Sequence, residues 1–182
     1  MNLAIIGRGR QGHRWTAVAV EEGHTVVWHS GADDFCPEVR ADAAIVATTP
    51  SRHAEVARRC LEQRLPVLID KPFALRVADA SEISARDPGI LVAFHPWIFD
   101  ASLRRLLDSV KCGEVEVVSR GPTREGWSPL WDWGPHAAAV ECYLHARDPR
   151  VLVRMDIGEA HEKLRRGSAP GWTWVDPADL GV

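Results

Sequence analysis

A glycine-rich turn between an apolar strand and a helix restricts the possible folds of this chain more than any other feature. Residues 2–6 form an apolar run that predicts a buried strand, and the turn Gly7-Arg8-Gly9-Arg10-Gln11-Gly12 follows it directly. A helix is expected over residues 13–22. In such a turn the first glycine allows a tight bend, the second lets a pyrophosphate approach the main chain, and the third lets helix and strand pack closely. We therefore predict a dinucleotide at this turn, facing the helix N-terminus; a purely structural turn is the alternative.

The residues after the second predicted strand, 25–28, bear on the choice between NAD and NADP. An acidic residue that binds the ribose is expected at the end of this strand, but His29 and Ser30 are found there. Without that carboxylate the 2'-phosphate of NADP is not repelled, and Ser30 can donate to it, with an arginine of the glycine-rich turn as charge partner. Asp33 and Asp34 follow shortly and can still reach a ribose. The sequence therefore predicts NAD or NADP and leaves the preference open.

Strands and helices alternate through the rest of the first half, after a loop between residues 30 and 43. Apolar runs predict three further buried strands, at residues 43–47, 67–69 and 90–94. Helical spacing of apolar residues follows Ser51, which can cap a helix, and recurs over residues 75–86. This alternating order is typical of a parallel sheet. We predict the α/β class, with a Rossmann-type NAD(P)-binding domain over residues 1–95.

Two polar motifs follow strands at the edge where open parallel sheets bind ligands. The strand at residues 67–69 stops at Asp70-Lys71-Pro72, and the proline forces Lys71 into an extended conformation. Lys71 can then reach a cofactor or a substrate hydroxyl, with a lysine in solvent as the alternative. The motif Thr48-Thr49-Pro50 ends the preceding strand. Considered alone, His53 in the next helix is a surface or packing histidine.

Beyond residue 95 strands and helices no longer alternate regularly in the predicted order. We expect a helix capped by Asp100 and a loop rich in glycine, proline and tryptophan over residues 121–133. The remaining expected elements are a strand at 114–119, a helix at 137–144, a strand at 151–157 and a candidate strand at 172–175. Residues 96–182 are therefore predicted to form a reduced α+β cap, which serves as a substrate and oligomerisation domain.

Asp132 and His136 are four residues apart at the start of a predicted helix. If the helix begins at Asp132, with Pro135 in its first turn, the two side chains share a face. The helix dipole then lowers the pKa of the histidine and the carboxylate opposes this shift, as in a general base that works near neutral pH. The alternative is that Asp132 only caps the helix and His136 only packs beside it.

Composition limits the possible partners. The 22 basic and 25 acidic residues are mixed, without a basic block that would neutralise a run of phosphates, so nucleic acid is not an expected partner. No apolar stretch approaches the roughly 20 residues that span a bilayer, and Met1 leads into a strand instead of a signal peptide. We expect a cytoplasmic protein that binds neither membrane nor metal. The four cysteines lack paired spacing and are expected to be reduced packing residues.

Four of these stretches together resemble the Gfo/Idh/MocA family of glucose-fructose oxidoreductases and inositol dehydrogenases. They are Gly7 to Gly12, the run Ala47-Thr48-Thr49-Pro50-Ser51-Arg52-His53, Asp70-Lys71-Pro72 in place of Glu-Lys-Pro, and Asp132 with His136. The first three stretches would bind the nicotinamide cofactor by this resemblance. The resemblance implies hydride transfer at a secondary alcohol carbon of a sugar, cyclitol or related small molecule. It also implies that Lys71 and Asp132 contact the substrate while His136 takes the hydroxyl proton.

The chain departs from the family pattern at three places. The usual helix and strand are missing between Ser30 and Ala43, and Ile98 stands where the family often has an arginine. Only 46 residues follow His136 (182 minus 136), whereas the family continues into a broad antiparallel sheet. A non-catalytic dinucleotide-binding accessory or sensor protein is therefore the alternative function. Because a cap with few strands leaves an open sheet edge, we also expect a homo-oligomer.

Overall fold

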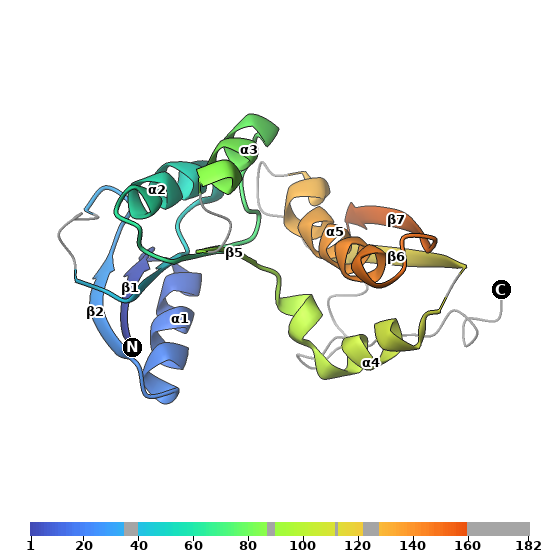
Figure 1. Cartoon of the computed structure of the whole chain (residues 1–182), viewed down its shortest axis with the longest axis horizontal. Helices are drawn as coiled ribbons and strands as arrows, with labels where there is room; N and C mark the ends of the chain where they lie inside the picture. The colour runs from blue at the N-terminus through green and yellow to red at the C-terminus, as the bar shows by residue number, and fades with distance from the viewer. Residues whose placement is uncertain (35–39, 87–89, 112, 122–127, 160–182) are drawn as a thin grey trace. The chain divides into compact units, whose positions relative to one another are not determined.

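The computed structural model describes residues 1–34, 40–86, 90–111, 113–121 and 128–159 (Figure 1). The chain divides into two compact units, residues 1–94 and residues 95–182. The candidate strand at residues 172–175 lies outside the described residues, as do Cys36 and Cys112. Within the described part, no helix is both long and apolar enough to cross a membrane.

The first unit is a five-stranded parallel sheet with helices on both faces, which confirms the predicted Rossmann-type α/β fold. Its strands are β1 (Asn2–Ile6), β2 (Thr25–Ser30), β3 (Ala43–Val46), β4 (Val67–Asp70) and β5 (Leu91–Phe94). Its helices are α1 (Arg10–Glu21), α2 (Pro50–Glu62) and α3 (Val77–Arg86). The strand order is β2-β1-β3-β4-β5: β2 is added on one side of β1, and β3, β4 and β5 are added on the other side. The order of the strands therefore reverses between β1 and β3. In open parallel sheets, ligands bind beside such a reversal, outside the carboxyl ends of the strands.

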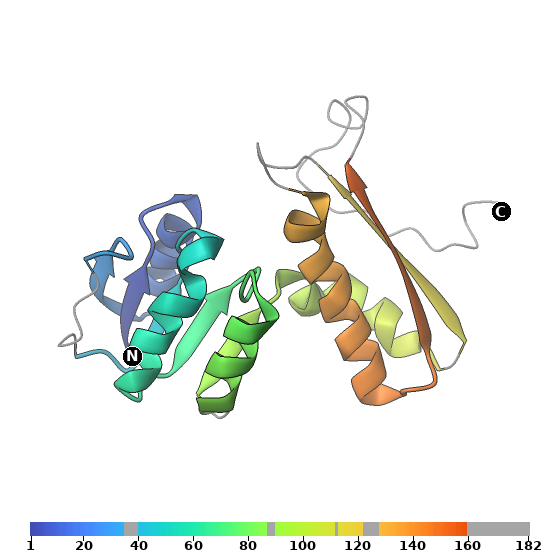
Figure 2. The same cartoon turned by 90° about the horizontal axis from the view of Figure 1, so that it is seen from above.

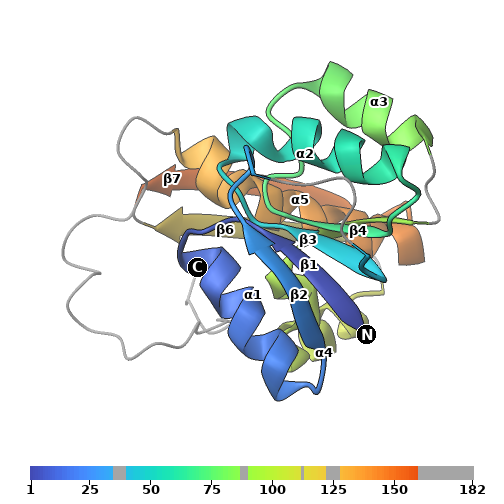
Figure 3. The same ribbon diagram turned by 90° about the vertical axis from the view of Figure 1, so that its left-hand side faces the viewer.

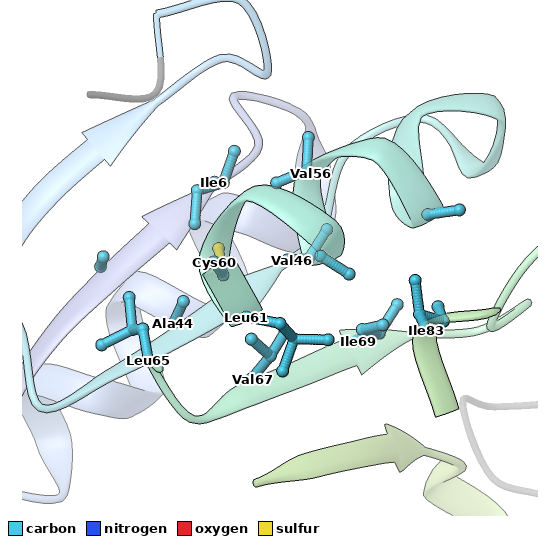
Figure 4. Close-up of a cluster of buried hydrophobic side chains, with 13 residues drawn as sticks. Ile6, Ala44, Val46, Val56, Cys60, Leu61, Leu65, Val67, Ile69 and Ile83 are labelled. Atoms are coloured by element: carbon cyan, nitrogen blue, oxygen red, sulfur yellow. The ribbon is translucent and has the colours of Figure 1, made fainter. Parts of the chain in front are cut away.

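Alternate residues of the strands enter two separate cores, as expected from the two-residue period of a strand. Ile6, Val46 and Ile69 pack against α2 and α3 with Val56, Cys60, Leu61 and Ile83 (Figure 4). Leu3, Ile5 and Ile45 face the opposite way and pack with Ala19 of α1. Figure 3 shows α1 on one side of the sheet and α2 with α3 on the other. Both faces of the strands are therefore apolar, which explains why their sequences read as continuous hydrophobic runs.

An apolar groove of about 370 Å³ remains on the face of the sheet that α1 covers in part. Its walls include Trp15 and Val18 from α1 and Ile45, Leu68 and Val92 from three strands. Val18 and Val92 are 46% and 52% exposed. The lining also contains the residues that precede β1, β2, β4 and β5, namely Met1, His24, Pro66 and Ile90. The groove therefore lies toward the amino ends of the strands, away from the edge that carries the glycine-rich turn.

The starts of all three helices of the first unit differ from the expectation; α3 begins at Val77, two residues later than expected. Helix α1 begins at Arg10, three residues earlier than expected. Helix α2 begins at Pro50 with Thr49 at the N-cap, so the prediction that Ser51 caps it is wrong. Proline is favoured at the first helical position because it has no N–H to satisfy and its φ is already helical.

The second unit contains a parallel pair of strands joined by a long helix. Its elements are η1 (Pro96–Phe99), α4 (Ala101–Ser109), β6 (Glu114–Gly121), α5 (Pro129–Arg147) and β7 (Leu152–Glu159). Asp100 caps α4, as predicted, by accepting a hydrogen bond from the Leu103 N–H at 2.8 Å. β6 and β7 pair in parallel, with α5 packed along them as the crossover helix (Figure 2). The described strands thus form a β-α-β unit, because parallel neighbours need a crossover of helix length.

The two described cysteines differ in environment. Cys60 is fully buried in α2, and burial raises the pKa of its thiol to about 12, so it is an inert packing residue as predicted. Cys142 is a free thiol, as predicted, but it is exposed on α5, so the prediction that it is a packing residue is wrong. Among the described residues, no cluster of three or more histidine, cysteine, aspartate or glutamate side chains could hold a metal ion.

Candidate cofactor and active site

The glycine-rich turn is closed by packing at its two ends and open at its centre. Gly7 has φ +145°, and a β carbon on it would overlap the main chain at Ala47. A β carbon on Gly12 would overlap the carbonyl group of Gly7. At Gly9 a β carbon would meet nothing within 4 Å. The first and third glycines are therefore needed by the fold, whereas the second leaves open space at the start of α1, where phosphate oxygens can approach free N–H groups.

Asp70 connects the end of β4 to the first turn of α1. Its Oδ1 accepts a hydrogen bond from the Lys71 N–H at 2.9 Å, and its Oδ2 accepts one from the side-chain amide of Gln11 at 3.4 Å. Asp70 is only 7% exposed, whereas the next residue, Lys71, is half-buried. The aspartate thus fixes the main chain at the predicted substrate lysine, at the carboxyl edge of the sheet.

His53 is buried between the two loops that carry the Thr48-Thr49-Pro50 and Asp70-Lys71-Pro72 motifs. It is 1% exposed, with Nδ1 at 2.7 Å from the Pro72 carbonyl oxygen and Nε2 at 3.1 Å from the Thr48 carbonyl oxygen. The packing interpretation of this residue is confirmed and the surface interpretation is wrong. Its contribution to a cofactor site is to hold both loops in position.

The residues after β3 lie beside the glycine-rich turn, because the main chain at Ala47 and Thr48 limits the space at Gly7. Thr48 is half-buried and its hydroxyl donates to the Thr49 carbonyl oxygen at 3.2 Å. Thr49 is exposed and Pro50 is buried at the start of α2. The fold therefore brings the first two sequence motifs together at the carboxyl edge of the sheet.

The end of β2 differs from what the sequence suggested. Ser30 is 1% exposed and its hydroxyl donates to the Gly31 carbonyl oxygen at 3.0 Å, which does not fit the predicted donation to a 2'-phosphate. The Nε2 of His29 lies 2.9 Å from the Gly7 carbonyl oxygen, so this ring also faces the turn. Arg8 and Arg10 are exposed.

Helix α5 begins earlier than the sequence suggested. It starts at Pro129, and the Oγ of Ser128 caps it by accepting a hydrogen bond from the Leu130 N–H at 3.2 Å. Asp132 lies in the first turn, whereas Pro135 lies inside the helix. The prediction that the helix begins at Asp132 or just after it, with Pro135 in the first turn, is therefore wrong. Serine followed by proline is a common start of a helix. Here the pair lies in a segment whose glycine, proline and tryptophan content predicts a loop, so the helix start was not predicted.

The earlier start changes the environment of His136. The helix dipole acts within about the first turn, and His136 is the eighth residue of the helix, so the predicted effect of the dipole on this histidine is lost. Asp132 and His136 still share a helix face because four residues separate them. Both are buried, at 5% and 4% exposure. A carboxylate and an imidazole are costly to bury, so their shared burial needs an explanation.

Aromatic side chains fix the ring of His136. Trp97, from η1, stacks on the imidazole with ring centroids 4.5 Å apart and an interplanar angle of 16°. Trp133 approaches the same ring at 6.1 Å with a tilt of 41°. Trp97 is 5% exposed and belongs to the core of the second unit. The histidine is therefore held in one orientation by packing, as a positioned proton acceptor requires.

Comparison with known proteins identifies the first unit. The family model described as GFO_IDH_MocA, oxidoreductase family with an NAD-binding Rossmann fold, matches residues 4–86. Inositol 2-dehydrogenase 1 of Saccharopolyspora erythraea is 33% identical over 121 residues, which cover 62% of this chain and 34% of the relative. Inositol 2-dehydrogenase 2 of the same organism is 28% identical over 180 residues, which cover 92% of this chain and 51% of the relative. The chain thus spans between a third and about half of the length of these curated relatives.

Solved structures share the fold over 79% of the chain. The myo-inositol 2-dehydrogenase of Lactobacillus plantarum matches with a TM-score of 0.64 and 16% identity, over 79% of this chain and 56% of that one. GenD2 from gentamicin A biosynthesis, solved in complex with NAD, matches with a TM-score of 0.69 and 18% identity, over 79% of this chain and 53% of that one. The sequence matches and the shared fold agree, and residues 4–86 of the first unit match the Gfo/Idh/MocA family of oxidoreductases.

Proposed function

We propose that the protein is an NAD(P)-dependent oxidoreductase that transfers a hydride at a secondary alcohol or ketone carbon of a sugar, cyclitol or related polar metabolite. The observation that carries this proposal is the joint burial of Asp132 and His136 on one face of α5, with the histidine ring held by Trp97. A buried carboxylate and imidazole are costly to the fold, and a catalytic role explains why both are kept. The curated relatives support this reaction class because they are inositol 2-dehydrogenases.

Each residue has a defined role in this proposal. The glycine-rich turn would hold the pyrophosphate of the dinucleotide, and the nicotinamide would supply the hydride-acceptor chemistry when bound. His136 takes the proton from the hydroxyl as the carbonyl forms, and Asp132 orients the ring and stabilises the imidazolium that results. Lys71 holds the reacting oxygen, with its main chain fixed by Asp70. In the reverse direction His136 returns the proton to the carbonyl oxygen.

The alternative is a non-catalytic accessory or sensor protein that binds the dinucleotide without turnover. The chain spans at most 51% of the length of the two dehydrogenases above, so the activity of those proteins is a proposal for this one. A substrate screen separates the two functions.

The test is a panel of cyclitols, sugars, polyols and uronates, assayed with NAD and NADP for reduced cofactor at 340 nm; keto sugars are assayed with NADH and NADPH. We expect turnover of at least one compound by the parent protein and none by the His136→Ala variant. Tight binding of a dinucleotide with no turnover on any compound would instead support the accessory protein.

We further propose a homo-oligomer, because the described strands β6 and β7 form a two-stranded sheet that packs against α5 on one face only. Its face away from α5 carries Val118 and Leu152, which are 53% and 66% exposed. Open sheet edges and apolar faces are usually covered in proteins. We expect a mass by light scattering well above the 20.2 kDa of one chain. A monomer mass at every concentration would contradict assembly.

A further inference from the structure

We propose that Asp34, paired with Arg8, makes the protein select NAD over NADP. The inference rests on the proposed function and names the residue that decides its cofactor. The sequence left this preference open because the expected ribose-binding acid is missing from the end of β2.

The end of β2 and the glycine-rich turn are direct neighbours. β1 and β2 pair in parallel with Ile6 opposite Ser30, and the N–H of Gly7 donates to the Ser30 carbonyl oxygen at 2.7 Å. In a Rossmann fold the adenosine ribose lies at this point, between the turn that binds the pyrophosphate and the end of the second strand. A side chain that reads the 2' position must therefore stand here.

The strand itself supplies no such side chain. Ser30 is buried, and its hydroxyl donates to the Gly31 carbonyl oxygen. The ring of His29 lies between the Gly7 carbonyl oxygen, at 2.9 Å, and the Thr16 hydroxyl, at 3.3 Å. Both polar residues at the strand end are thus engaged by the turn and by α1.

Asp34 places a carboxylate near the end of β2, where the ribose-binding acid is expected. Its Oδ2 lies 3.5 Å from the point where a β carbon on Gly31 would stand, so the loop folds back over the end of β2. The same oxygen pairs with Nη2 of Arg8 at 2.8 Å. A carboxylate therefore stands beside the glycine-rich turn, four residues after β2 ends at Ser30.

The loop that carries Asp34 is anchored from the other side by α2. Arg59 donates to the Ala32 carbonyl oxygen at 3.2 Å, and Arg52 pairs with Asp33 at 2.7 Å. Asp33 is thereby directed to α2, while Asp34 is directed to the turn. The two neighbouring acids have different tasks: the first anchors the loop and the second faces the cofactor.

The charges at this point favour NAD. A carboxylate accepts a hydrogen bond from the 2'-hydroxyl of NAD, whereas the 2'-phosphate of NADP brings close to two negative charges against it. Arg8 would attract that phosphate, but Asp34 already neutralises its charge. The side chains of this pair are 65% and 51% exposed, and such pairs contribute little to stability. Changing either residue should therefore leave the fold intact.

The test compares NADH and NADPH dissociation constants of the full chain, measured by cofactor fluorescence. We expect the parent to bind NADH roughly ten times more tightly than NADPH or better, as for a hydrogen bond to a charged group. Asp34→Asn keeps the size but removes the charge, and it should shift the ratio of the two constants toward NADPH by about 10-fold or more. Asp33→Asn, the matched control, keeps an Oδ1 that can accept from Arg52 and so anchor the loop, and it should leave the ratio unchanged.

A double variant tests the part of Arg8. Adding Arg8→Ala to Asp34→Asn should remove the gain in NADPH affinity, because the freed guanidinium provides it. The inference is overturned if the parent binds both cofactors equally or prefers NADPH, if Asp33→Asn shifts the ratio as far as Asp34→Asn, or if the double variant keeps the gain. A folded parent that binds neither cofactor overturns the proposed function itself, a result distinct from binding without preference.

Discussion

Replacing His136 with alanine is expected to lower turnover by about 100-fold or more, because general acid–base catalysis contributes at least that much to a proton transfer. Lys71→Ala should have an effect of similar size if the lysine holds the reacting oxygen. Cofactor affinity should survive in both variants, since the glycine-rich turn is unchanged. Asp132→Asn should cost less than His136→Ala, because an amide still orients the ring. The measurements are steady-state turnover on a substrate from the screen and a cofactor titration for each variant.

Matched controls exist for both residues. His145 is an exposed histidine on the same helix α5, and Lys111 is an exposed lysine that follows α4. Alanine at either position should leave turnover within a small factor of the parent value. Parent activity that persists in both His136→Ala and Lys71→Ala would refute the assigned roles, and an equal loss in the controls would indicate damage to the fold instead.

Gly12→Ala is expected to destabilise the first unit by about 3 kcal/mol or more, at or above the upper range for overpacked sites. The added β carbon would overlap the Gly7 carbonyl group, which is main chain and cannot rotate away. Gly9→Ala is the matched control, because a β carbon there meets nothing within 4 Å. Chemical denaturation should show a large loss of unfolding free energy for the first variant and a small change for the second.

Gly9→Val extends this comparison to function. The larger side chain fills the open centre of the turn, so we expect a folded protein that no longer binds NADH or NADPH in a fluorescence titration. If this variant binds both cofactors as well as the parent, the turn is only structural. Loss of folding in Gly9→Val would show that the space at this glycine is smaller than the structure indicates.

The fold of the first unit was predictable because the signals that define it are local. Each strand is an apolar run, and β1 begins and ends at the expected residues, 2 and 6. The start of α5 was not predictable from composition, because Ser128 and Pro129 lie in a segment rich in tryptophan, glycine and proline. The sequence therefore predicts Pro135 in the first turn of the helix, although the proline lies inside it. Packing of Ala137, Val140 and Leu144 in the core keeps the helix continuous despite the lost hydrogen bond.

The motif residues could be selected from the sequence, but their partners could not. His53 contacts Pro72 at a separation of 19 residues, and Gln11 contacts Asp70 at a separation of 59. Such contacts depend on which loops the sheet order brings together, and spacing along the chain does not encode that order. For the same reason the sequence suggested Ser30 for the 2' position, although the hydroxyl is turned inward and a carboxylate from further along the loop stands nearby.

The groove beside α1 has a practical consequence for how the folding of this protein is judged. Its lining is apolar, and both Val18 and Val92 are about half exposed. Dyes such as anilinonaphthalene sulfonate bind exposed apolar surface and are used to recognise molten globules. They should fluoresce with the native protein here, so dye signal alone would misreport a folded variant as partly unfolded. Near-ultraviolet circular dichroism, to which the buried Trp97 contributes, reports side-chain packing without a bound dye.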